Sequence, residues 1–140
     1  MMPLVGGNDS HMWKFIQASG QLFFNDVEVW LGYSGAGGGK NAPDRQHVRN
    51  QGPIPRGWWT IGEATDDGPT ALSLPLIPDP GTKLFGRFGF YIHGENARRP
   101  GASSRGCIIV DHDVRVSLRD STDRRLLVIA RTFRRRSARR

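Results

Sequence analysis

Short apolar runs alternate with turn residues from the start of the patterned part of the chain. Residues 13–18 (WKFIQA) and 21–24 (QLFF) flank a Ser-Gly turn, and Asn25-Asp26 leads into 27–33 (VEVWLGY), where apolar residues alternate. Such short runs, bounded by Ser, Gly, Asn and Asp, are typical of β-strands joined by tight turns. We therefore predict a meander of three strands at the start of the domain.

Two long connections rich in glycine and proline occupy the middle of the chain. Residues 34–53 are too glycine-rich for a regular element, and residues 62–82 contain four prolines, so we expect loops in both places. Loops of this length in a compact domain are commonly functional or disordered. Apolar runs predict strands at 58–61, between these loops, and at 88–92, after them.

The C-terminal part begins with an ambiguous pattern. Asp111 can cap a short helix that places Val110, Val114 and Leu118 on one face, but the alternation at 114, 116 and 118 also fits a strand. The run RLLVIARTF, from residue 125, predicts a closing strand. The expected fold class is therefore mainly β, with one or two short helices.

Length and composition narrow the class of protein. The chain has 140 residues and one cysteine, which suits one domain and excludes both an intramolecular disulfide framework and a cysteine-rich zinc site. No cluster has the spacing of metal ligands, so we expect no metal and no cofactor. No run reaches the roughly 18 apolar residues of a membrane span. We expect one folded domain over residues 13–130.

The two ends of the chain differ from this domain. Residues 1–12 have no basic start followed by an apolar run, and Ser10-His11-Met12 resembles a cloning junction, so we expect a tag or disordered leader without a signal peptide. Of the 20 basic residues, six lie in 131–140; the remaining 14 face 13 acidic residues, a balance of +1. We expect a solvated Arg-rich tail, which could alternatively hold an anionic polymer.

Candidate chemistry is concentrated in FYIHGEN and SSRGCIIV. His93 follows an apolar run, and Cys107 comes fourteen residues later, so a strand, a loop and a second strand could bring the two together. A thiol with an ordinary pKa of about 8.5 is mostly protonated at neutral pH, and an imidazole can take its proton. A lone cysteine before Ile-Ile-Val is nevertheless, by default, a buried core residue.

The residues around Cys107 add to the catalytic interpretation. Gly106 would allow the sharp turn that points the amides of Gly106 and Cys107 at an oxyanion. Ser104 could orient His93 through its hydroxyl or its carbonyl. Each of these signals is weak by itself, and the joint pattern favours a nucleophilic cysteine.

That joint pattern resembles a known family. His-Gly, a loop and then Ser-x-Gly-Cys followed by an apolar residue is similar to the catalytic motif of the L,D-transpeptidases (YkuD type). The stretch GYSGAGGGKNAPDRQHVRNQGPIPRGWWTIG resembles the upstream signature of the L,D-transpeptidase effectors delivered by type VI secretion. The resemblance covers about 13–129, and GPIPRG together with SRGC makes it specific.

The resemblance implies a β-sandwich-like catalytic fold and a peptidoglycan substrate. Cys107 would attack the carbonyl of the L-centre of meso-diaminopimelate in a tetrapeptide stem and release D-alanine. Water as acceptor gives L,D-carboxypeptidase activity, a free D-amino acid gives exchange, and a second stem gives a 3–3 cross-link. Type VI machinery would deliver the protein, made in the cytoplasm, to the periplasm of a target bacterium. A cognate immunity protein would protect the producer.

The resemblance also assigns roles by position. Cys107 matches the nucleophile, His93 the base, Ser104 the assisting serine and Gly106 the oxyanion glycine. The cleft-lining positions that it implies are Tyr33, Ser34 and Gly94. Two positions depart from the common pattern: Arg105 replaces a histidine and could hold a substrate carboxylate, and Ile109 replaces an arginine. Both departures favour the effector branch over classical cross-linking.

Other interpretations remain open at this point. A housekeeping L,D-transpeptidase would normally carry an export signal. A papain-like enzyme usually has its cysteine at a helix N-terminus and its histidine well downstream, opposite to the order here. A binding module for nucleic acid would spread its basic residues over a folded face, and a non-catalytic peptidoglycan binder would not need His, Ser, Gly and Cys together.

Overall fold

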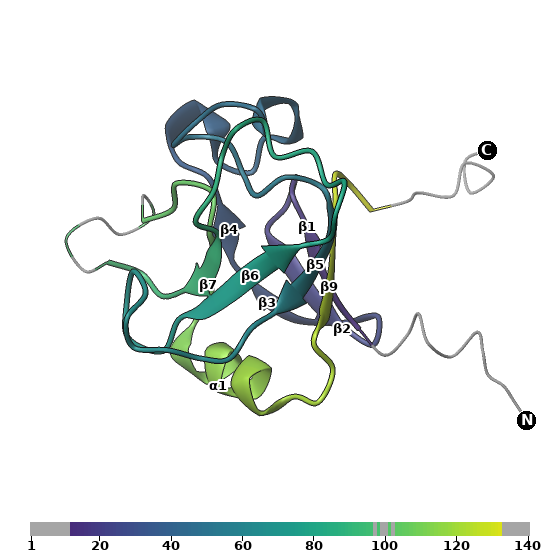
Figure 1. Ribbon diagram of the computed structural model, residues 1–140, viewed down its shortest axis with the longest axis vertical. Helices are drawn as coiled ribbons and strands as arrows, with labels where there is room; N and C mark the ends of the chain where they lie inside the picture. Colours follow the sequence, from purple (N-terminus) through teal and green to yellow (C-terminus); the bar gives the residue numbers. More distant parts are fainter. Residues whose placement is uncertain (1–11, 97, 99–100, 102, 133–140) are drawn as a thin grey trace, which may run out of the picture.

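The computed structural model describes residues 12–96, 98, 101 and 103–132 and is mainly β (Figure 1). One helix, α1 (His112–Asp120), and two short 3₁₀ helices, η2 (Gly37–Gly39) and η3 (Pro43–Arg45), accompany the sheet. The nine strands are β1 (Trp13–Ile16), β2 (Gln21–Phe24), β3 (Val27–Leu31), β4 (Tyr33–Ser34), β5 (Gly57–Ile61), β6 (Leu74–Pro78), β7 (Tyr91–His93), β8 (Ile108–Ile109) and β9 (Arg125–Ile129). The expected fold class is confirmed.

The strands form one nine-stranded sheet in the order β3-β2-β1-β9-β5-β6-β7-β8-β4. β3 and β4 are its two edges, yet only Gly32 separates them in the chain. The sheet must therefore curl until its edges approach each other, which gives a nearly closed barrel. Gly32 sits at this closure, where a β-carbon would lie 2.2 Å from the carbonyl oxygen of Ile109.

The predicted meander and the predicted closing strand are both present. β1, β2 and β3 pair antiparallel in chain order. β9 lies between β1 and β5, parallel to the first and antiparallel to the second. The two ends of the domain are thereby joined in the middle of the sheet.

One expectation for the middle of the chain is wrong. Residues 62–82 are not a continuous loop, because β6 lies within them despite Pro75 and Pro78. Leu74 and Pro75 pair with β7, whereas Leu76 to Pro78 pair with β5. The two ladders thus overlap only at the middle of β6, where the amide of Gly62 donates to the carbonyl oxygen of Pro75 and the amide of Leu76 donates to that of Phe90. Each proline is paired in one ladder only, and a missing N–H is tolerated where a strand edge is unpaired.

The next strand begins later than predicted. We expected a strand at 88–92, but β7 covers Tyr91–His93. Gly89 has a φ of +79°, and Phe88 is 88% exposed, so the chain turns before it enters the sheet. His93 is the last residue of the strand, as the sequence pattern indicated.

The ambiguous segment after β8 is helical. Asp111 adopts an extended conformation, and its carboxylate accepts a hydrogen bond from the amide of Asp113, which caps the first turn of α1. Within the described part of the chain, no helix is long and apolar enough to cross a bilayer.

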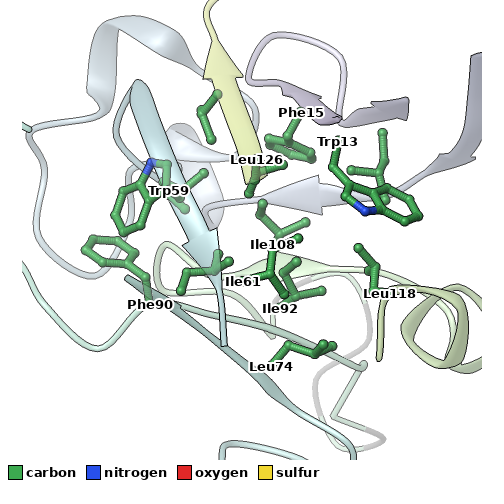
Figure 2. Close-up of a cluster of buried hydrophobic side chains, with 14 of the residues drawn as sticks. Trp13, Phe15, Trp59, Ile61, Leu74, Phe90, Ile92, Ile108, Leu118 and Leu126 are labelled. Carbon is green, nitrogen blue, oxygen red and sulfur yellow. The ribbon is translucent and has the colours of Figure 1, made fainter. Parts of the chain in front are cut away.

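A single apolar core fills the inside of the curved sheet (Figure 2). Trp59 and Phe90 meet edge to face with ring centroids 5.2 Å apart. Leu118 closes one side of this core from α1. The core includes Ile92 from β7 and Ile108 from β8, and it therefore fixes the two strands that carry the candidate chemistry. Both predicted terminal segments, apart from Met12, Arg131 and Thr132, lie outside the described residues.

Candidate active site

The parallel pair β7–β8 brings His93 and Cys107 onto one face of the sheet. Ile92 lies beside Ile108 and His93 beside Ile109, so Cys107, directly before β8, falls beside Tyr91. Ile92 and Ile108 are fully buried in the core. Because successive side chains of a strand point to opposite faces, the side chains of His93 and Cys107 share the other face.

Cys107 is a nearly buried thiol, 7% exposed. Its Sγ accepts a hydrogen bond from the amide of Tyr91 at 3.3 Å and lies 3.6 Å from the carbonyl oxygen of Gly89. Burial raises the pKa of the thiol to about 11, against the opposing effects of the Tyr91 amide and the charge of Arg87. The thiol is therefore protonated at neutral pH.

His93 is buried and oriented by the backbone. Its Nδ1 lies 2.8 Å from the carbonyl oxygen of Gly94, and a carbonyl can only accept, so Nδ1 carries the hydrogen. The lone pair is left on Nε2, the nitrogen that can take a proton. Burial lowers the pKa of the imidazole, the Gly94 carbonyl raises it, nearby Arg115 lowers it further and Glu95 raises it; the net shift is downward.

The two groups do not form a resting ion pair. Among the described residues, no hydrogen bond joins His93 to Cys107. Both pKa shifts favour a neutral imidazole and a neutral thiol over the thiolate–imidazolium pair that the sequence suggested. Proton transfer between them therefore has to be driven by what enters the site.

Ser104 organises the turn that precedes Cys107. Its hydroxyl donates to the carbonyl oxygen of Cys107 at 2.5 Å and accepts from the amides of Gly35 and Gly106 at 2.8 Å and 3.0 Å. These contacts use the donor and both acceptor sites of a hydroxyl. In the structure the hydroxyl thus contacts the turn, whereas the Nδ1 of His93 contacts Gly94.

The two backbone amides predicted to stabilise an oxyanion differ in whether they are free to donate a hydrogen bond. The amide of Gly106 is already bonded to Ser104, whereas no described residue accepts a hydrogen bond from the amide of Cys107. Gly106 has a φ of +124°, so the sharp turn expected there is present. The amide of Cys107 is the donor left to stabilise negative charge.

Ser34 and Tyr33, expected to line the cleft, hold neighbouring segments together. The Ser34 hydroxyl donates to the carbonyl oxygen of Gly106 at 3.2 Å and accepts from the amide of Ile54 at 2.9 Å. The Tyr33 hydroxyl donates to Glu95 at 2.5 Å and accepts from the amide of Ser103 at 3.0 Å. Both residues are buried, and both support the loops around the β7–β8 pair.

Glu95 fastens the loop between β7 and β8. Its carboxylate accepts hydrogen bonds from Tyr33, from the Ser103 hydroxyl and from the amide of Gly101. Burial raises the pKa of this carboxyl, but these hydrogen bonds and the charge of Lys40 outweigh burial and lower it. The sequence motif included Glu95 only as a letter after His-Gly and gave no role to it.

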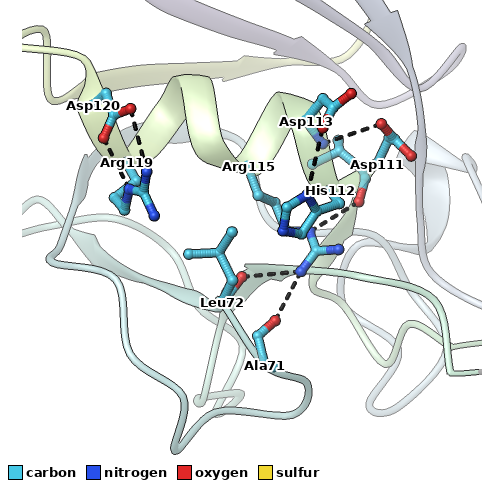
Figure 3. A network of polar contacts seen from close by, with 9 residues as sticks. Ala71, Leu72, Asp111, His112, Asp113, Arg115, Arg119 and Asp120 are labelled. Carbon is cyan, nitrogen blue, oxygen red and sulfur yellow. Dashed lines mark hydrogen bonds and ion pairs between the residues drawn. The ribbon is translucent and has the colours of Figure 1, made fainter.

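Gly94 lies between the base and a buried arginine on α1. A β-carbon at Gly94 would lie 2.5 Å from a guanidinium nitrogen of Arg115. Arg115 donates to the carbonyl oxygens of Ala71 and Leu72 at 2.8 Å and 3.1 Å (Figure 3). The amide of Gly94 donates to the Thr70 hydroxyl at 2.9 Å. Arg115 and the 70–72 segment therefore fix the carbonyl that orients His93.

Two arginines accompany the Cys107 turn. The side chain of Arg105, which the sequence suggested for a carboxylate, is exposed and lies two residues before Cys107. Arg87 is buried, and its guanidinium donates to the carbonyl oxygen of Arg105 at 3.2 Å. Sequence reasoning missed Arg87; its position inside the apolar run LFGRFGF was the available signal.

Other candidate features lie away from the β7–β8 pair. A cavity of about 790 Å³ lies against β1, β2, β3 and α1, and its lining includes Trp13, Phe24 and Trp30 but neither Cys107 nor His93. Across the described residues, no group of three or more His, Cys, Asp and Glu side chains is placed to hold a metal ion. The chemistry that the described site offers is therefore that of a thiol, an imidazole and one free amide.

Comparison with known structures shows a similar fold. The structure of Bd1075 from Bdellovibrio bacteriovorus is similar, with a TM-score of 0.56 and 16% identity; the match covers 91% of this chain and 50% of that chain. This chain thus spans about half the length of Bd1075, and the likeness shows the fold. No curated protein matches the sequence.

A family model described as the Tlde1 domain matches residues 28–131. This range contains β7, β8 and every candidate site residue named above. Because the match covers well over half of the sequence, the chain belongs to the Tlde1 domain family, a toxin domain family associated with type VI secretion effectors.

Proposed function

We propose that this domain is a cysteine enzyme that modifies peptidoglycan. It cleaves the meso-diaminopimelate–D-alanine bond of tetrapeptide stems, as an L,D-carboxypeptidase with water and as an exchange enzyme with a free D-amino acid. The observation that carries the proposal is the shared face of His93, at the end of β7, and Cys107, directly before the adjacent parallel strand β8. A core cysteine would not need a buried histidine beside it with Nε2 left as its free nitrogen.

The first step transfers an acyl group to the enzyme. Nε2 of His93 takes the proton of Cys107 as Sγ attacks the carbonyl carbon, and the carbonyl electron pair moves to the oxygen. The amide of Cys107 donates to that oxyanion. When the oxyanion collapses, the C–N bond breaks, His93 returns the proton to the departing amine, and D-alanine leaves.

The second step releases the acyl group from the thioester. His93 takes a proton from water, or from the amine of a D-amino acid, as that nucleophile attacks the same carbonyl carbon. Collapse of the second oxyanion breaks the C–S bond, and the proton returns to Sγ. The exposed guanidinium of Arg105 would hold a stem carboxylate beside the turn during both steps.

The biological setting follows from membership of the family. Loss or exchange of the terminal D-alanine would deprive a target cell of cross-linking donors, which makes the domain an antibacterial toxin in the periplasm. A producer then needs an immunity protein that blocks the cleft. The alternative of a housekeeping enzyme that forms 3–3 cross-links is less well supported, because the family is one of effector-associated toxins.

The decisive experiment is mass spectrometry of purified peptidoglycan fragments after incubation with the protein, with and without a free D-amino acid. Cys107→Ala and His93→Ala are the test variants, and His112→Ala, at an exposed position on α1, is the matched control. Loss of one alanine from tetrapeptides, or its replacement, is expected with the wild type and the control only.

Two outcomes would contradict the proposal. If folded wild-type protein leaves the fragments unchanged, Cys107 is better interpreted as a buried core residue and the protein as a binding module. Equal turnover by Cys107→Ala would remove the thiol from the mechanism.

A further inference from the structure

A buried cation lies against the turn that carries the proposed nucleophile. Arg87 is 5% exposed, and its guanidinium donates to the carbonyl oxygens of Gly52 and Pro53, both at 2.9 Å, and to those of Gln46 and Arg105. Within the described part of the chain, no carboxylate forms an ion pair with it. A buried charge without a counter-ion is costly, so its position requires an explanation.

The guanidinium lies at the backbone of the nucleophile turn. A β-carbon at Gly106 would lie 2.3 Å from Nη2 of Arg87, and the guanidinium carbon lies 5.3 Å from the centroid of the Phe90 ring. The contact with the carbonyl of Arg105 ties the guanidinium to the same turn. Arg87 therefore approaches the turn of Cys107 at the residue directly before it.

The position of Arg87 against the turn places a positive charge near the thiol of Cys107. Burial disfavours a thiolate at this position, and Arg87 is the charged group that opposes that effect; the amide of Tyr91 adds a hydrogen bond. Tyr91 and His93, on the neighbouring strand, are the other titratable residues on this face, and the lowered pKa of His93 keeps its imidazole neutral at rest. When Cys107 loses its proton, the thiolate becomes the missing counter-ion of Arg87.

We propose that Arg87 is a positioning residue that stabilises the thiolate of Cys107 electrostatically while it fixes the 105–107 turn. This inference rests on the proposed function only in taking Cys107 as the nucleophile. The competing explanation is that Arg87 is a structural link between residues 46–53 and the turn, with no effect on the thiol.

Alkylation of Cys107 separates the two explanations, because the chain has one cysteine and the assay needs no peptidoglycan. The rate of reaction with iodoacetamide is measured against pH for wild type, Arg87→Gln and Arg87→Lys. Arg119→Gln, which removes an exposed arginine on α1, is the matched control. The pH midpoint reports the thiol pKa, whereas the plateau rate at high pH reports access to the thiol.

An electrostatic role predicts that Arg87→Gln moves the midpoint up by about one unit or more, roughly a tenfold slower reaction at a fixed lower pH. Arg119→Gln should keep the wild-type midpoint. Arg87→Lys carries a charge only at a pH well below the ordinary lysine pKa of about 10.4, so at pH 8 it should react at a rate closer to the wild type than Arg87→Gln does. A purely structural role would change the plateau rate or the thermal midpoint in both Arg87 variants and leave the pH midpoint in place. That result would overturn the inference.

A second measurement uses stability and another variant of Arg87, in case Arg87→Gln does not fold. Cys107→Asp and Cys107→Asn have nearly the same shape but differ in charge. Burial makes the Asp variant lose stability relative to the Asn variant as pH rises from 4 to 8, and the charge of Arg87 should reduce that loss. The loss should therefore be larger when each variant is combined with Arg87→Met, and an equal loss with and without Arg87 would overturn the inference. Labelled Cys107 without peptidoglycan turnover would contradict the proposed function instead.

Discussion

The Nδ1 atom of His93 lies 2.8 Å from the carbonyl oxygen of Gly94, the next residue in the chain. The group that orients the proposed base is therefore a backbone carbonyl rather than a third side chain. That carbonyl is held in place by the Thr70 hydroxyl and by the packing of Arg115 against Gly94. The state of the base thus depends on α1 and on the 70–72 segment, which are distant in sequence.

Replacement of Gly94 by alanine tests this dependence. Its β-carbon would lie 2.5 Å from the Arg115 guanidinium, so Arg115 or the Gly94 carbonyl must move. We expect Gly94→Ala to lower the free energy of unfolding by about 1–3 kcal/mol and to reduce turnover. Gly38→Ala is the control, since its β-carbon would meet nothing closer than 4.0 Å. Chemical denaturation of both variants gives the comparison, and equal stability would contradict the account.

The lowered pKa of His93 predicts a specific dependence of stability on pH. The folded state binds the proton less readily than the unfolded state, whose histidine has a pKa of about 6.5. The contribution of neutral His93 to the free energy of unfolding is therefore complete above the unfolded-state pKa. This contribution is lost as pH falls from about 6.5 through the folded-state pKa.

His93→Asn isolates this contribution, because an asparagine amide can still donate to Gly94 but does not titrate. The difference in free energy of unfolding between wild type and His93→Asn should shrink as pH falls from 7.5 to 5. Urea unfolding at these pH values provides the measurement. A difference that grows toward acid would mean that His93 gains a proton on folding.

Ser104→Ala distinguishes support of the turn from assistance to the base. The variant leaves the amides of Gly35 and Gly106 and the carbonyl of Cys107 without their hydroxyl partner, so we expect a loss of about 1–3 kcal/mol in unfolding free energy. Turnover should fall because the 104–107 turn is no longer held in place. The pKa of His93, followed by NMR, should stay near its wild-type value. A large shift of that pKa would restore Ser104 to a direct role at His93. Ser117→Ala, exposed on α1, is the control.

The thiol of Cys107 should react slowly in the free protein. With a pKa of about 11, it holds far less thiolate at pH 7.5 than an unfolded cysteine. We expect alkylation of the native protein to be at least about a hundredfold slower than in denaturant, because both the thiolate fraction and the access to Sγ are reduced. Comparable rates in the two states would show a thiol that is already activated.

The regular elements of the fold were predictable where local chemistry decides them. The turns at Ser19-Gly20 and Asn25-Asp26 identified three strands from their own residues. The Asp111 cap indicated a helix but left a strand open for the same segment. β6 was missed because Pro75 and Pro78 are ordinarily strand breakers, and only the split pairing of that strand makes them acceptable. Such pairing depends on where β5 and β7 lie, which no local pattern contains.

The candidate site, like the fold, was predictable only where the local sequence decides the structure. The motif permitted a strand, a loop and a second strand that bring His93 and Cys107 together, and β7 and β8 are neighbours with Cys107 directly before β8. The partners of Gly94 and Ser104, and the burial of Arg87 and Arg115, arise from contacts between segments far apart in sequence. Arginine is ordinarily a surface residue, so its presence in the printed sequence did not indicate burial.

The single-residue link at Gly32 has a consequence for the kinetics of folding. The hairpins of β1–β3 join residues that are close in the chain. By contrast, β4 pairs with β8 and β1 pairs with β9, and in each pair the two strands are far apart in the sequence. Contacts of that kind carry a large loop-closure cost and form slowly. Since the 104–107 turn is bonded to Ser34 and Gly35 beside that link, a refolding chain would form its early hairpins first and the turn around Cys107 last.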